Sequence, residues 1–211
     1  VAGAQGGSLV PVARAIMTTD RFPKVRGRAV GHGRLVGIAK GAGMIEPRLG
    51  TLLCFLLTDV SVGREELRSA LAWAAGRTLN RISIDGDQST SDMAVLLSSR
   101  SKGPADPAEF RAALFGVLSD LAADVVRNGE GASHVIRVKV SGAGDDEAAA
   151  GAGKAVVNSP LVKTAVCGND PNVGRLAGAI GDWAGSAAPR LDPSSVSVRL
   201  GGVEVLAGGA F

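Results

Sequence analysis

Six consecutive apolar residues, 52–57, have to leave water when this chain folds. The run is short and follows a glycine-rich stretch, so it indicates a buried strand or a turn of buried helix. Thr51, preceded by Gly50, stands at the head of the run. A β-branched threonine suits the start of a strand, which is the simpler interpretation of the dipeptide alone. A threonine with a free α-amino group, however, carries a general base beside its hydroxyl, so the pair is also a candidate scissile bond.

Composition limits the class of protein further. A chain of 211 residues that is 45% apolar is typical of a folded globular protein with one substantial core. Aromatic residues make up only 3% and glycines number 30, so the core must consist mainly of Ala, Val and Leu with close backbone approaches. Cys54 and Cys167 lack metal-ligand spacing, which favours reduced thiols in a cytoplasmic protein.

No apolar stretch reaches the ~18 residues that a membrane span needs, so we expect no membrane partner. The first residues lack the charged and apolar regions of a signal peptide. Charge is unevenly distributed: residues 1–50 hold eight Lys and Arg against two acids, whereas the remainder is acidic overall. Base-stacking aromatics and nucleic-acid motifs are missing, which argues against a nucleic-acid partner. The basic segment indicates either a solvated face or a field that favours a carboxylate substrate.

Helical and strand patterns alternate along the chain and predict an α/β fold with mixed sheets and packed helices. The clearest helix start has Asp106 as N-cap, Pro107 in the first turn and Glu109 completing a capping box. An apolar stripe follows it, and Gly129 or Gly131 is expected to end the helix. Further helices are predicted over 62–79 and 170–183, and strands over 34–40, 82–84 and 136–140. A hairpin is predicted over 196–205, with its turn at 201–202.

Three apparent binding motifs fail on spacing. The segment ending at Lys154 lacks the first glycine of a phosphate-binding loop, and Ala155 replaces the hydroxyl residue that holds magnesium. His32 and His134 have no convincing ligand cluster and are interpreted as surface or capping residues. The acidic segment 85–92 lacks the glutamate of a calcium loop and predicts a hydrogen-bonded turn. We therefore expect neither a metal nor a cofactor.

Five segments, taken together and in order, carry a family resemblance. They are AIMTTD, GIAKGAGMIEPRLGTLLCFLLTDV, NRISIDGDQSTSD, RNGEGASHVIRVKVSGA and LVKTAVCGNDPNVGRLAGAIG. The chain resembles the ornithine acetyltransferase family, the bifunctional glutamate N-acetyltransferases of arginine biosynthesis, from about Ala15 to Val205. The resemblance implies an N-terminal-nucleophile enzyme that cuts its own precursor before a threonine.

On this resemblance, self-cleavage falls between Gly50 and Thr51. Residues 1–50 then belong to the end of an α chain and 51–211 to most of a β chain, and the two assemble as an α2β2 heterotetramer. Most relatives have Met-Ala-Thr-Met-Leu here, whereas this chain has Leu-Gly-Thr-Leu-Leu at 49–53. In this departure the chain resembles a paralogue of the family that is associated with clavulanic acid biosynthesis. A glycine before the threonine is sterically permissive and does not oppose cleavage.

The chemistry suits a chain without a catalytic histidine. The freed α-amine of Thr51 has an unperturbed pKa near ~7.7–8.0 and can take the proton of its own hydroxyl. The resemblance implies that Thr51 takes the acetyl group of N-acetylornithine and passes it to glutamate. It also implies that Thr18, Lys40, Thr51 and Glu130 contact substrate. Lys40 suits a carboxylate, and Glu130 suits an ammonium group.

Other parts of the family pattern lie outside these residues. The family's oxyanion-hole Thr-Gly pair and its C-terminal substrate-binding block are not found, so the chain resembles a central part of the family sequence. Loss of oxyanion donors typically costs ~10²–10³ in rate. Two alternatives therefore stay open: an N-terminal-nucleophile amidohydrolase that passes the acyl group to water, and a non-catalytic binding module.

Overall fold

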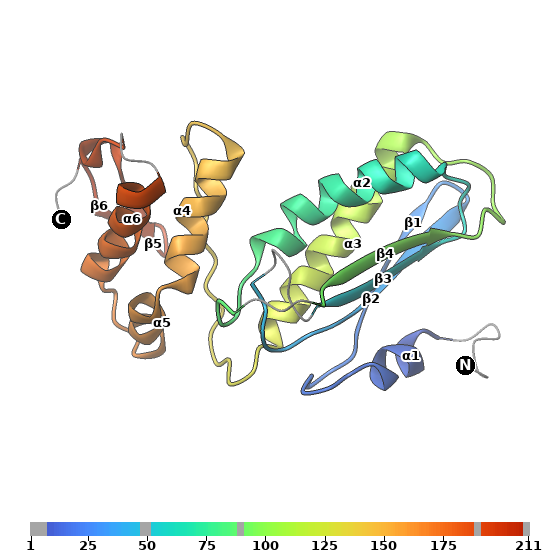
Figure 1. Cartoon of the computed structure of the whole chain (residues 1–211), viewed down its shortest axis with the longest axis horizontal. Helices are drawn as coiled ribbons and strands as arrows, with labels where there is room; N and C mark the ends of the chain where they lie inside the picture. The colour runs from blue at the N-terminus through green and yellow to red at the C-terminus, as the bar shows by residue number, and fades with distance from the viewer. Residues whose placement is uncertain (1–7, 47–51, 88–90, 188–190, 209–211) are drawn as a thin grey trace. The chain divides into compact units, whose positions relative to one another are not determined.

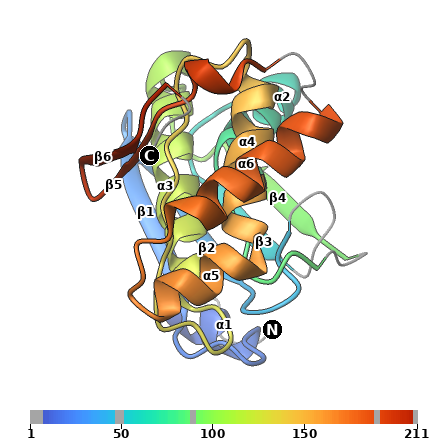
Figure 2. The same cartoon turned by 90° about the vertical axis from the view of Figure 1, so that its left-hand side faces the viewer.

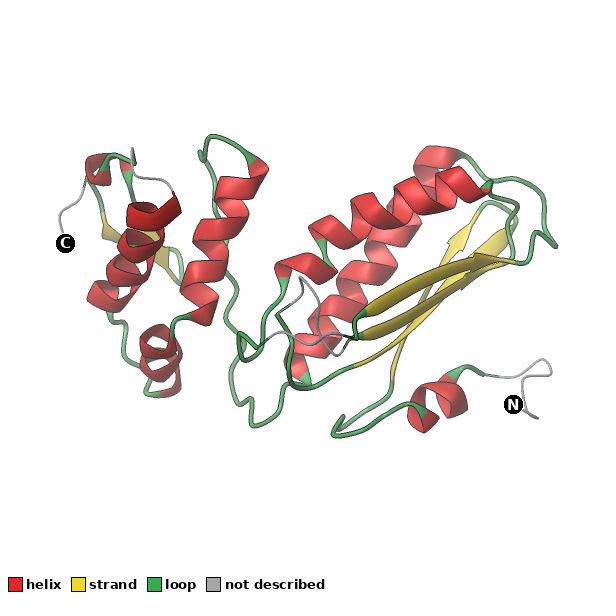
Figure 3. Cartoon of the chain, viewed as in Figure 1, coloured by secondary structure: helices red, strands yellow, loops and turns green. Residues whose placement is uncertain are grey.

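The structure is a computed structural model that describes residues 8–46, 52–87, 91–187 and 191–208. It divides into two compact units, Val1–Ala132 and Ser133–Phe211, here called the N-terminal and C-terminal units (Figure 1). Helices and strands occur in both, and in the N-terminal unit they form separate layers (Figure 3). The predicted mixed α/β class is confirmed.

The N-terminal unit is built on a four-stranded mixed sheet. Strands β1, β2 and β3 are antiparallel neighbours, and β4 pairs parallel to β3. The strands are β1 (Lys24–Val30), β2 (Gly33–Lys40), β3 (Leu53–Thr58) and β4 (Met93–Ser98). The predicted strand over 34–40 is therefore confirmed, and the apolar run that follows Thr51 is a strand rather than a helix turn.

The apolar run is buried on one side only. Cys54 and Leu56 are fully buried, whereas Leu57 is 39% exposed. Successive side chains of a strand point to opposite faces of the sheet, and helices α2 (Arg64–Arg77) and α3 (Pro107–Arg127) cover one face (Figure 1). The composition of the run predicted that all of it is buried, and this prediction is confirmed for every second residue only.

Helix α3 is the main element of the core. Its predicted start is confirmed, because the Asp106 side chain accepts hydrogen bonds from the amides of Ala108 and Glu109, both at 2.9 Å. The helix ends at Arg127, and Asn128 is its C-cap, just before Gly129. The predicted stripe is fully or almost fully buried; its members are Phe110, Leu114, Leu118, Leu121 and Val125.

A glycine in β2 allows α3 to lie close to the sheet. A Cβ at Gly37 would lie 2.8 Å from the Leu121 side chain and 2.9 Å from those of Leu56 and Val117. Any side chain at position 37 would therefore have to displace these three side chains. This is one of the close backbone approaches that a core poor in aromatic residues requires.

Several local predictions were wrong. Residues 82–84 are not a strand: they follow a short 3-10 helix, η1 (Leu79–Arg81), and Ile84 donates one backbone hydrogen bond to Ile45. Glu109 does not close a capping box, because its carboxylate accepts from the amide of Gly31, at 2.8 Å. Strands β1 and β4 and helix α1 (Val10–Ala15) were not predicted.

The basic N-terminal segment finds acidic partners within the same unit. Arg26 of β1 donates two hydrogen bonds to Asp124 of α3, at 2.7 and 2.8 Å, and Arg28 pairs with Asp120. The hydrogen bond to Asp124 raises the pKa of the Arg26 guanidinium. Part of the basic charge therefore joins β1 to α3, a role that neither interpretation of this segment included.

The described part of the C-terminal unit contains three α-helices and a small hairpin. Helix α6 lies against α4 and α5 (Figure 2). The predicted hairpin is confirmed: β5 and β6 pair antiparallel, and both turn glycines, Gly201 and Gly202, have positive φ. The elements are α4 (Asp146–Asn158), α5 (Pro160–Cys167), α6 (Val173–Ala187), η2 (Pro193–Ser195), β5 (Val198–Leu200) and β6 (Val203–Leu206).

Two sequence predictions for this unit differ in outcome. The helix predicted over 170–183 is confirmed as α6. Residues 136–140 alternate in exposure as predicted, but they pair with no strand among the described residues and do not form one. Helices α4 and α5 were missed. None of the helices within the described ranges is long and apolar enough to cross a membrane.

Candidate active site

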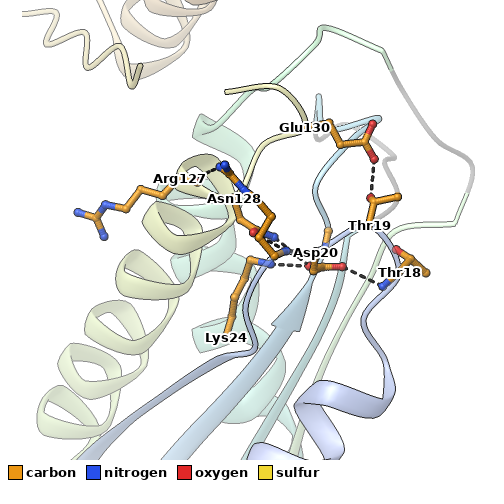
Figure 4. Close-up of polar contacts among 9 residues, drawn as sticks. Thr18, Thr19, Asp20, Lys24, Arg127, Asn128 and Glu130 are labelled. Carbon is orange, nitrogen blue, oxygen red and sulfur yellow. Dashed lines mark hydrogen bonds and ion pairs between the residues drawn. The ribbon is translucent and has the colours of Figure 1, made fainter. Parts of the chain in front are cut away.

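A buried carboxylate, Asp20, joins three segments that are distant in the sequence. It accepts hydrogen bonds from the amide of Thr18 at 3.1 Å and the amide of Gly41 at 2.9 Å. The side-chain amide of Asn128 donates to it at 3.3 Å. Asp20 therefore holds together the AIMTTD segment, the residue after β2 and the end of α3 (Figure 4).

Lys24 supplies the countercharge for this carboxylate. Its Nζ lies 2.5 Å from Asp20 Oδ1, and both side chains are completely buried. The ring of Phe22 covers the ammonium group, 5.4 Å from its centroid. Burial alone raises the pKa of Asp20, but hydrogen bonds from Gly41, Lys24 and Thr18 outweigh it and lower the pKa below its usual value. Asp20 is thus held as a carboxylate.

Glu130 follows α3 and lies against the same segments. Its amide donates to the carbonyl of Ala42 at 2.8 Å, and its carboxylate accepts from the Thr19 hydroxyl at 2.5 Å. Figure 4 shows Thr19 and Glu130 pointing toward each other, while the Arg127 side chain points away from the cluster. A Cβ at Gly43 would lie 3.0 Å from the Glu130 carboxyl carbon. The Glu130 carboxylate therefore lies directly over the Gly43 backbone.

The structure brings together the segments that carry Thr18, Lys40 and Glu130. Thr18 is exposed, and its amide is held by Asp20. Lys40 ends β2 and is only 9% exposed. It lies opposite Leu53 in the β2–β3 pairing, so it sits one strand away from the residues that follow Thr51. Three of the four predicted substrate-binding residues thus occupy one end of the sheet.

Gly50 and Thr51, the predicted cleavage site and nucleophile, lie outside the described residues. Acidic side chains hold the chain on both sides of them. Asp85 accepts from the amides of Met44 and Ile45, at 2.6 and 3.1 Å. Asp92 accepts from the amide of Leu52 at 2.5 Å. Burial raises the pKa of Asp92, and the hydrogen bond from Leu52 partly opposes that rise.

The acidic segment 85–92 therefore has a structural role within the part that is described. The Asp85 carboxylate also accepts from the amide of Asp87, which fits the predicted hydrogen-bonded turn. No group of three or more possible metal ligands occurs among the described residues. His32 and His134 are both exposed, as predicted for surface residues.

The C-terminal unit contains a separate, largely apolar cavity of about 770 Å³. Residues 136–140 line it together with faces of α4, α5 and α6. Trp183 and Leu176 form part of its wall, and Arg137, Lys139 and Arg199 supply charge. None of Thr18, Lys40 and Glu130 lines this cavity. The residues predicted to bind substrate therefore identify the Asp20 cluster as the candidate site.

Sequence reasoning missed Thr19, Asp20, Lys24, Gly43 and Asn128. Lys24 pairs with Asp20, four residues away, but the other contacts join positions far apart: Thr19 and Glu130 are separated by 111 residues, and Asp20 and Asn128 by 108. No local spacing connects such residues. The only available signal was their presence in, or next to, the AIMTTD, GIAKGAGM and RNGEGA segments.

The mixed α/β fold of this chain is similar to that of a protein whose crystal structure is known. It superposes on the crystal structure of the arginine biosynthesis bifunctional protein ArgJ of Bacillus halodurans with a TM-score of 0.67. The two are 34% identical, and the match covers 74% of this chain and 75% of that one. The two proteins are therefore similar in sequence as well as in fold.

The chain belongs to the ArgJ family, because residues 3–211 match that family's sequence model. It is 48% identical over 199 residues to the glutamate N-acetyltransferase Oat2 of Streptomyces clavuligerus, covering 94% of this chain and 50% of that protein. It is 46% identical over 193 residues to the arginine biosynthesis bifunctional protein ArgJ 2 of a Nostoc species, covering 92% and 49%. The chain thus spans about half the length of these curated relatives.

Proposed function

We propose that the protein is an acyltransferase that moves the acetyl group of N-acetylornithine to glutamate through an acetyl-Thr51 intermediate. The observation that carries this proposal is the convergence of the segments bearing Thr18, Lys40 and Glu130 beside the strand that follows Thr51. The 48% identity to a protein named glutamate N-acetyltransferase supports it. N-acetylornithine as donor is the substrate that the family resemblance implies.

We further propose that the nucleophile arises by self-cleavage between Gly50 and Thr51. The Thr51 hydroxyl attacks the Gly50 carbonyl, the peptide nitrogen leaves as the new α-amine, and water then hydrolyses the ester. Gly50 becomes a carboxyl terminus, and Thr51 becomes the first residue of its chain. Residues 1–50 then end an α chain, 51–211 form most of a β chain, and the two associate as α2β2.

In the transfer step the new α-amine takes the proton of the Thr51 hydroxyl, and the oxygen attacks the acetyl carbonyl of the donor. Ornithine leaves with that proton on its amine. The amine of glutamate then attacks the acetyl ester, and the threonine oxygen recovers a proton. In this scheme Lys40 binds a substrate carboxylate, Glu130 binds an ammonium group and Thr18 contacts the donor.

Both cysteines are free thiols, which supports a reducing compartment, and we propose the cytoplasm. Cys54 is buried and Cys167 is exposed. An exposed thiol is oxidised more readily outside the cell than in a reducing cytoplasm.

N-terminal sequencing of full-length protein tests the cleavage. Wild-type protein is expected to run as two chains under denaturing conditions, and the second should begin Thr51-Leu52-Leu53-Cys54. Thr51→Ala removes the hydroxyl and should leave one uncut, inactive chain, whereas Thr51→Ser keeps a hydroxyl and should still be cut. Cleavage of Thr51→Ala at the same bond would show that Thr51 is not the self-processing nucleophile.

Acetyl transfer measured with and without glutamate tests the reaction. The proposal predicts that release of ornithine from N-acetylornithine depends on glutamate and yields N-acetylglutamate. Release that is independent of glutamate and yields acetate would identify an amidohydrolase instead. An uncut Gly50–Thr51 bond together with no turnover would favour a binding protein.

A further inference from the structure

We infer that Thr19 and Gly43 determine the specificity of the candidate site by holding the Glu130 carboxylate in one orientation toward a cationic amine of the substrate. This inference rests on the proposed function and adds two residues to it. Neither residue is among the predicted substrate contacts, and both lie against the same carboxylate.

The first observation is the contact with Thr19. Its hydroxyl donates to Oε1 of Glu130 at 2.5 Å, although both residues are exposed. An exposed glutamate normally samples several rotamers, and fixing it costs conformational entropy. With the hydroxyl in place, that cost is met before a ligand arrives, so Thr19 preorganises the carboxylate.

The second observation is the absence of a side chain at position 43. A Cβ there would lie 3.0 Å from both Cδ and Oε2 of Glu130, and 3.1 Å from Oε1. Such distances are tighter than ordinary van der Waals contact, so the carboxylate would have to move. The amide of Glu130 donates to Ala42, the residue before Gly43, at 2.8 Å, so the two backbones are already joined. Gly43 therefore provides the space in which the carboxylate lies.

The third observation concerns charge. Arg127, three residues earlier, instead lies 3.5 Å from Asp124. In the ranges that the structure describes, no lysine or arginine forms an ion pair with Glu130. A carboxylate accepts about four hydrogen bonds, and Thr19 uses one. The oriented carboxylate keeps its charge and most of its acceptor capacity for an ammonium group.

The test compares two acetyl donors in full-length protein, with glutamate as acceptor. N-acetylornithine carries the terminal amine, and N-acetylnorvaline has the same carbon skeleton without it. Thr19→Val replaces the hydroxyl with a methyl group of similar size. It should lower kcat/KM for N-acetylornithine by about tenfold and change that for N-acetylnorvaline by less than about twofold. Thr19→Ser should restore the preference.

Gly43→Ala should reduce the same preference, because it displaces the carboxylate. Gly76→Ala is the matched control, because a Cβ at position 76 meets no atom within 4 Å. It should leave kcat/KM unchanged for both donors. An equal decrease in kcat/KM for both donors in Thr19→Val would overturn this inference alone. Failure of Thr19→Ser to restore the preference for N-acetylornithine would do the same. Wild-type protein that transfers acetyl from neither donor would overturn the proposed function together with it.

Discussion

Replacing Asp20 with Asn is expected to be among the more destabilising conservative changes in the N-terminal unit. Asn keeps the size of the side chain but removes its charge, leaving the fully buried Lys24 ammonium without a countercharge. Removing one partner of a buried ion pair typically costs ~3–5 kcal/mol. At roughly 2–4 °C per kcal/mol for a chain of about 200 residues, the melting temperature should fall by about 6–20 °C.

The assay is thermal and urea unfolding of full-length protein, followed by circular dichroism at several pH values. The folded-state pKa of Asp20 is lowered, because hydrogen bonds from Gly41, Lys24 and Thr18 outweigh the effect of burial. A carboxyl with a lowered pKa contributes stability that is present above its unfolded pKa and is lost as pH falls through its folded pKa. The difference in unfolding free energy between wild type and Asp20→Asn should therefore be largest near neutral pH and should decrease below about pH 4.

Two further variants separate the ion pair from nonspecific effects. Asp182→Asn removes an exposed carboxylate of α6 and should cost less than about 0.5 kcal/mol. Lys24→Met combined with Asp20→Asn removes both buried charges and should recover part of the stability lost in the single variant. A decrease in unfolding free energy of less than about 1 kcal/mol for Asp20→Asn would refute the stabilising role of the buried pair. The same conclusion would follow if the double variant were no more stable than the single variant.

Three other outcomes are expected. Burial raises the pKa of Cys54 to about 12, so a thiol reagent at pH 8 should label only the exposed Cys167 in folded protein and both cysteines in urea. Leu118→Ala leaves a cavity in the fully buried stripe of α3 and should lower the unfolding free energy by ~2–5 kcal/mol in urea titrations. Lys40→Ala should raise KM for N-acetylornithine by the equivalent of ~1.5–3 kcal/mol in steady-state kinetics, and unchanged kinetics would remove Lys40 from the site.

Elements with strong local signals were predictable from the sequence. The start of α3 depends on the Asp106 cap and Pro107, and the β5–β6 turn depends on two glycines, all within a few residues. Strand β1 was not predictable in this way, because Lys24 lies on its buried side and Arg26 pairs with α3. Lys24, Arg26 and Arg28 alternate along β1 and share one face, so the side of the strand on which apolar residues are expected carries charge instead. The acidic partners of the two arginines lie on α3, about a hundred residues away.

The candidate site also depends on contacts between distant residues, which local sequence signals do not reveal. Thr18, Lys40 and Glu130 were predicted from a family resemblance, and no spacing among them indicated a common site. What joins the segments that carry them is a set of hydrogen bonds to Asp20 from Thr18, Gly41 and Asn128. The burial of Asp20 and its ion pair with Lys24 depend on the folded sheet. A buried Asp–Lys pair four residues apart looks, in sequence, like two exposed charges. Its position was visible only once β1 and α3 were packed.

The course of α3 along β2 explains how distant residues reach one end of the sheet. At its start, Glu109 accepts from the amide of Gly31, in the turn before β2. Along its middle, Gly37 lets Leu121 lie against the strand, and beyond its end Glu130 donates to Ala42, just after β2. The helix and the strand therefore run in the same direction and finish together. Because Gly37 lets the side chains of Val117 and Leu121 pack directly on the strand, the close packing of the core also fixes where Glu130 meets the segment that follows Lys40.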